Sequence, residues 1–119
     1  MHITVLIIEA EQPEGLSARK LILETSKHNV LTAYNGIEGI RLFRRFPAVD
    51  AVVVHVNVAD IPFAEVVQQI RGIRADVPVI ALSPVGPVQL QGVDYVLPSH
   101  QPQALLTLLA EKFGASTAK

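Results

Sequence analysis

Short apolar runs rich in β-branched residues recur along this chain, and segments with helical patterning separate them. The clear runs cover residues 3–8, 30–33, 51–54 and 78–82, and a weaker one covers 94–97. Such runs are shorter than a typical helix, and their unbroken apolar character is typical of strands that are buried on both faces of a sheet. We therefore predict strands at these places.

The segments between the runs carry apolar residues at helical spacing. Such stripes predict helices within 16–27, 37–46, 63–73 and 105–113. Strands that alternate with helices predict a parallel sheet with right-handed crossovers and helices on both faces. The predicted fold class is therefore α/β, with a three-layer, doubly wound, five-stranded parallel sheet.

The link between the fourth and fifth predicted strands is short for a parallel crossover. Residues 83–93 include two prolines and two glycines, whereas such a connection usually contains a helix. An extended chain of this length still reaches back along the sheet. We expect the helix at this place, the fourth in chain order, to be missing or reduced to a turn.

Composition and charge indicate one ordinary globular domain. The chain has 119 residues, 18% of them charged, and a formal net charge of −1. We expect a single domain over 1–119, with an ordered core over about 2–113 and a flexible tail over 114–119. The charge balance argues against nucleic acid and membrane surfaces as partners. Because cysteine and a signal-peptide pattern are both lacking, we expect a cytoplasmic protein.

Ligands of doubly wound sheets bind outside the carboxyl ends of the strands. In this sequence these ends carry Glu9, Ala10 and Glu11 after the first strand, His55 after the third, Ser83 after the fourth, and Pro98, Ser99 and His100 after the fifth. We expect any chemistry of the chain to draw on this set.

Several motifs, in order along the chain, resemble those of the receiver domains of two-component response regulators. They are VLIIEAE (5–11), TAYNGIEGI (32–40), PVIALS (78–83) and VDYVLP (93–98), and residues 50–71 follow the family pattern without a gap. The resemblance extends over residues 3–109. It implies the flavodoxin-like receiver fold and a role in phosphorelay signal transduction.

The resemblance also implies a phosphorylation pocket, from which this sequence departs. In receivers an aspartate that ends the third strand accepts the phosphoryl group, acidic residues after the first strand hold magnesium, and a lysine follows the fifth strand. The matching positions here are His55, then Glu9 with Ala10, then Pro98. Magnesium prefers oxygen ligands, usually including carboxylates, and an imidazole cannot form an acyl phosphate.

Three other positions keep the family pattern. Ser83 and Tyr95 match the residues that relay the phosphorylation signal, and Asn57 matches the residue whose main-chain carbonyl binds the metal. We therefore predict a degenerate pseudo-receiver, which is not an enzyme and has no catalytic residues or cofactor.

The residues of the vacated pocket have alternative interpretations. His55 either fills space, or takes up a proton or a phosphoryl group on its ring. Glu9 either pairs with His55 or joins His55 and Glu11 in a weak site for a transition metal. Ser83 is interpreted as a hydrogen-bonding residue at a strand end rather than as a nucleophile.

Two surface features are candidates for interaction. The three arginines within 41–45 are either the solvated face of a helix or a small basic patch for an acidic partner. The link before the fifth strand is apolar for a loop, and its Val88 and Leu90, together with Tyr95, form a candidate interaction surface. The alternative is that the link only covers the sheet edge left by the missing helix.

We expect the chain to act in signal transduction by phosphorylation-independent binding of a protein partner, either a signalling protein or a second copy of itself. The alternative is a ligand-, metal- or pH-responsive switch, or a phosphoryl carrier, that uses the pocket around His55. Substitution of His55 would leave an adaptor able to bind but would remove the response of a switch or a carrier.

Overall fold

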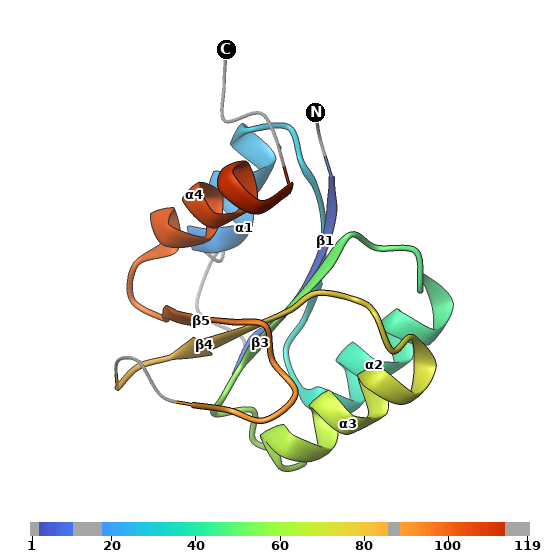
Figure 1. Cartoon of the computed structure of the whole chain (residues 1–119). Helices are drawn as coiled ribbons and strands as arrows, with labels where there is room; N and C mark the ends of the chain where they lie inside the picture. The colour runs from blue at the N-terminus through green and yellow to red at the C-terminus, as the bar shows by residue number, and fades with distance from the viewer. Residues whose placement is uncertain (1–2, 11–17, 86–88, 114–119) are drawn as a thin grey trace.

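The computed structural model describes residues 3–10, 18–85 and 89–113 (Figure 1). Its strands are β1 (Thr4–Ile8), β2 (Asn29–Ala33), β3 (Ala51–His55), β4 (Val79–Ser83) and β5 (Tyr95–Pro98). Its helices are α1 (Ala18–Thr25), α2 (Gly36–Arg45), α3 (Phe63–Ile73) and α4 (Pro102–Phe113). Every predicted element is present, although the expected start of the first helix lies outside the described residues.

The strands form one parallel sheet in the order β2-β1-β3-β4-β5. Helices α2 and α3 cover one face of the sheet, and α1 and α4 cover the other (Figure 1). This confirms the predicted fold class, a three-layer α/β fold with a doubly wound sheet of five strands in the described part of the chain.

The alternation of side chains along each strand divides the core into two clusters. Val52 and Val54 of β3 point into the cluster under α2 and α3, whereas Val53 points into the cluster under α1 and α4. Because side chains alternate with a period of two along a strand, a sheet covered on both faces needs an unbroken apolar run. All three valines are fully buried.

The link from β4 to β5 contains no helix in its described parts, residues 84–85 and 89–94. This agrees with the predicted loss of the fourth crossover helix, and the helix labelled α4 is the C-terminal one. Residues 86–88, which include the predicted contact residue Val88, lie outside the described residues.

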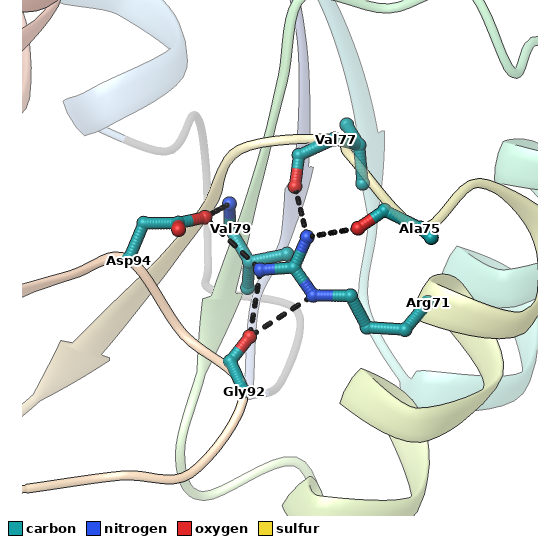
Figure 2. A network of polar contacts seen from close by, with 6 residues as sticks. All are labelled: Arg71, Ala75, Val77, Val79, Gly92 and Asp94. Carbon is teal, nitrogen blue, oxygen red and sulfur yellow. Dashed lines mark hydrogen bonds and ion pairs between the residues drawn. The ribbon is translucent and has the colours of Figure 1, made fainter.

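Arg71 on α3 holds this link in place (Figure 2). Its guanidinium donates hydrogen bonds to the carbonyl oxygens of Gly92 at 2.8 Å and Val77 at 2.5 Å, and to Oδ2 of Asp94 at 3.0 Å. The same Oδ2 accepts the backbone N–H of Val79 at 2.8 Å. One side chain thus joins the end of α3, the start of β4 and the approach to β5.

The predicted domain bounds extend beyond the described residues. Residues 1–2 and the proposed flexible tail over 114–119 lie outside them, so the bounds remain a prediction. Within the described residues, none of the helices is long and apolar enough to cross a membrane.

Candidate functional site

The carboxyl ends of the strands bring the predicted pocket residues to one edge of the sheet. His55 is the last residue of β3, and Ser83 and Pro98, the last residues of β4 and β5, are partners in the strand register. Glu9 follows β1 directly, and its backbone N–H donates to the carbonyl of Ala33 at 2.8 Å. The topology therefore places these residues at the carboxyl ends of β1, β3, β4 and β5.

Glu9 is buried and forms an ion pair with Arg19 of α1, a residue that the sequence analysis did not single out. Arg19 Nε lies 3.1 Å from Glu9 Oε2, and Nη2 bonds the other carboxylate oxygen. The two side chains are only 12% and 8% exposed, so the pair is largely shielded from water. This fork-to-fork geometry is the strong form of an arginine–carboxylate contact.

Arg19 also reaches the loop after β5. Its Nη1 donates a hydrogen bond to the carbonyl oxygen of Ser99 at 2.5 Å, and the N–H of Ser99 bonds the carbonyl of Ser83 at 3.0 Å. The guanidinium therefore links the ends of β1 and β5 across the pocket edge. Nothing in the spacing of the helix stripe marks Arg19 for this role, because its partners lie 10 and 80 residues away.

His55 is half-buried, and its ring is already used in a local hydrogen bond. Its Nδ1 accepts the backbone N–H of Asn57 at 3.0 Å, which places the ring proton of the neutral imidazole on Nε2. Burial and the nearby charge of Arg19 lower the pKa of His55 below its ordinary value of 6.5, although the charge of Glu9 opposes them. The neutral form is thus favoured in the folded protein.

The remaining pocket positions offer little to a phosphoryl group. Ser83 is 1% exposed, and its hydroxyl accepts the N–H of Val85 at 3.3 Å, which fits the predicted role at a strand end. Ala10 has no polar side-chain atom, and Pro98 has no backbone N–H and no charge. The side chain of Asn57 is exposed.

Two other aspartates near β3 have structural roles. Asp50 lies before β3, at its amino end, and accepts the N–H of Thr4 at 2.8 Å. Asp60, in the loop after β3, accepts the N–H groups of Gly36 at 2.7 Å and Ile37 at 2.9 Å, at the start of α2. Although burial acts to raise it, these hydrogen bonds hold the pKa of Asp60 below its ordinary value.

The donor set at this edge does not fit magnesium. Both carboxylate oxygens of Glu9 bond Arg19, Ala10 supplies no ligand, and His55 presents nitrogen where magnesium requires oxygen. Within the described residues, no group of three or more acidic or histidine side chains could hold a metal ion. Glu11, the other weak candidate ligand, lies outside them.

The described members of the candidate interaction surface lie together beside β5. Leu90 and Tyr95 line an open hollow of about 520 Å³ along the link and the start of the strand. Lys112 of α4 lies over the Tyr95 ring, 5.9 Å from its centroid. Tyr95 is therefore held on the side of the sheet that carries α4.

No protein-family model matches the sequence, and no curated protein matches it significantly. Solved structures do match. The receiver domain of a sensor histidine kinase from Pseudomonas aeruginosa, crystallised with a magnesium ion in its active-site cleft, is 20% identical, with a TM-score of 0.79 over 96% of this chain and 99% of that one.

Two further receiver structures give the same result. A CheY-like response-regulator receiver domain protein from Methanospirillum hungatei is 20% identical, with a TM-score of 0.78 over 96% of this chain and 95% of that one. A receiver domain from Clostridium thermocellum is 25% identical, with a TM-score of 0.74 over 87% of each chain. These likenesses establish that the chain has the fold of receiver domains.

Proposed function

We propose that this receiver-fold chain acts in signal transduction as a cytoplasmic adaptor that binds a protein partner without being phosphorylated and without catalysing a reaction. The fold shared with receiver domains supports the signalling role. The loss of the acceptor aspartate, one acidic ligand and the lysine supports independence from phosphorylation.

The ion pair of Arg19 with Glu9 is the observation that carries this proposal. Receivers, as the resemblance implies, gather positive charge in this pocket from a bound magnesium ion and from a lysine after the fifth strand. Here a guanidinium of the chain itself bonds the remaining carboxylate and the Ser99 carbonyl. Because arginine stays protonated in proteins, this positive charge is permanent and requires neither metal nor phosphate.

The alternative roles of His55 have less support. A pH switch near neutrality needs a pKa close to neutral, whereas burial and Arg19 lower the pKa of this ring. A phosphoryl carrier needs a ring nitrogen with a free lone pair, but Nδ1 accepts the Asn57 N–H and Nε2 then carries the proton. The ring is best explained as a hydrogen-bonded residue that fills the acceptor position.

Amide NMR spectra with and without magnesium and beryllofluoride, a mimic of the phosphoryl group, test the proposal. We expect the resonances of Glu9, His55 and Ser83 to stay unchanged, while a receiver with an intact acceptor aspartate, run in parallel, responds. Shifts that saturate at these residues would show that the pocket still recognises a phosphoryl group, and the proposal would be wrong.

A further inference from the structure

The six arginines of the chain fall into two groups of different character. Those engaged with carboxylates and backbone carbonyls are Arg19, Arg71 and Arg74. Those on the exposed side of α2 are Arg41, Arg44 and Arg45. Within the described residues, each arginine of the first group forms an ion pair, whereas none of the second group does.

Glu38 on α2 and Glu65 on α3 bond groups other than these three arginines. Glu38, one turn before Arg41, accepts the N–H of Tyr34 at 2.9 Å at the start of the helix. On α3, Glu65 accepts a hydrogen bond from Gln69, and the amide oxygen of Gln69 in turn is the only described contact of Arg44, at 3.4 Å. Among the described residues, no carboxylate bonds Arg41, Arg44 or Arg45.

Exposed apolar side chains flank these arginines. Ile37 at the start of α2 is 49% exposed and Phe46 at its end is 43% exposed, two of the three large hydrophobic residues that are exposed in the described part of the chain. Arg45 lies over the Phe46 ring, 5.6 Å from its centroid. Arg45 and Phe46 thus place charge and apolar surface next to each other at the end of α2.

The turn after α2 is held rigidly. Arg74 donates to the carbonyl oxygens of Pro47 at 2.9 Å and Val49 at 2.7 Å. Pro47, which follows Phe46 in the chain, lines a shallow and open hollow with Ala48 and Arg74. These hydrogen bonds hold the backbone of the turn, and a backbone that is held in advance loses less conformational entropy when a partner binds.

We infer that the α2 surface, formed by Arg41, Arg44, Arg45 and Phe46, binds an acidic segment of a protein partner that carries an apolar side chain. This inference rests on the proposed function and names the surface and the chemistry of the partner. Arginine forks match carboxylates in pairs, and the exposed ring of Phe46 matches an apolar side chain. A nucleic acid is disfavoured, since three arginines within about 6 Å of helix rise on a chain of net charge −1 make a small basic footprint.

The test uses a short peptide of Asp and Glu residues with one central Leu, titrated into the labelled protein and followed by NMR. We expect saturable shifts on α2 and on Phe46, and weaker binding as salt rises from about 0.05 to 0.5 M. The triple variant Arg41→Glu, Arg44→Glu, Arg45→Glu should bind at least roughly tenfold more weakly. The matched control Lys20→Glu, Lys27→Glu, Lys112→Glu has the same change in net charge, and its affinity for the peptide should stay within about twofold of that of the parent protein.

Phe46→Ala tests the apolar contact separately from the charge. The variant keeps the net charge of the parent, and we expect it to bind the peptide more weakly. Equal loss in the lysine and arginine triples would mean attraction by net charge alone, and shifts confined to the link before β5 would place the docking surface there; either overturns the inference. Tighter binding of oligothymidine than of the peptide would make the partner a nucleic acid. None of these results depends on the beryllofluoride response, which tests the phosphorylation-independent function by itself.

Discussion

Arg71 Nη2 on α3 lies 3.0 Å from Asp94 Oδ2, just before β5, and this pair bonds the end of α3 to the chain that leads into β5 (Figure 2). The same guanidinium bonds the carbonyls of Gly92, Ala75 and Val77. The described end of the link between β4 and β5 is thus bonded to α3 through one side chain.

Replacing Arg71 with methionine should lower the free energy of unfolding by about 2 kcal/mol. The variant keeps much of the apolar stem but leaves several carbonyls and the Asp94 carboxylate without this donor, and unsatisfied partly buried acceptors cost about 1–3 kcal/mol. Urea unfolding provides the measurement. Arg44→Met is the matched control and should stay within about 0.5 kcal/mol of the parent. Equal effects in the two variants would mean that the network contributes nothing.

Arg19→Met should also destabilise the fold, because it removes the guanidinium that bonds both oxygens of the buried Glu9 carboxylate. Breaking a buried pair from one side costs about 3–5 kcal/mol, and the small residual exposure here points to about 3 kcal/mol. The double variant Glu9→Gln, Arg19→Met should recover part of this loss. With the charge of Arg19 removed, the pKa of His55 should rise, which an NMR titration can measure. An unchanged His55 pKa would contradict this description of the pocket.

Stability should depend on pH through His55. Burial, followed by the charge of Arg19, lowers the pKa of this ring, so the unfolded chain binds a proton at higher pH than the folded one. The contribution of His55 to the free energy of unfolding is therefore complete above its ordinary pKa of 6.5 and is lost as the pH falls below that value. For one proton, the free energy of unfolding changes by at most about 1.4 kcal/mol per pH unit. His55→Asn keeps an acceptor for the Asn57 N–H, and its urea midpoint should fall less between about pH 7.5 and 5.5. A fall equal to that of the parent would rule out the contribution of His55.

Two helix glycines should respond to alanine in opposite directions. A Cβ at Gly39 would collide with the side chain of Ile8 in β1, whereas a Cβ at Gly72 meets nothing within 4 Å. Gly39→Ala should therefore destabilise by about 1–3 kcal/mol through overpacking between α2 and the sheet. Gly72→Ala should stabilise by up to about 1 kcal/mol, because alanine restricts the unfolded chain. Thermal unfolding of both variants measures the contrast, which vanishes if α2 can move away from β1.

The sequence allowed much of the site to be predicted, because its position follows from local pattern. Apolar runs locate the strands, and the residue after each run is then placed at the carboxyl edge of the sheet. This brought Glu9, His55 and Ser83 into one predicted site. The interpretation that Glu9 pairs with His55 missed the main partner, since Arg19 bonds both carboxylate oxygens of Glu9.

By itself, the sequence determined the α/β fold and the strand ends that carry Glu9, His55 and Ser83, because hydrophobic periodicity is a local property of the chain. The shortness of the link also predicted that its described parts, residues 84–85 and 89–94, contain no helix. Only the tertiary structure decided which charged side chains meet. Arg19 and Arg71 look like ordinary polar positions of amphipathic helices, as Arg41 and Arg44 do. Their roles depend on carbonyls and carboxylates from distant segments, such as Ser99 for Arg19 and Gly92 for Arg71. Packing of the helices on the sheet brings these groups together, and the spacing of the residues along the chain does not predict these contacts.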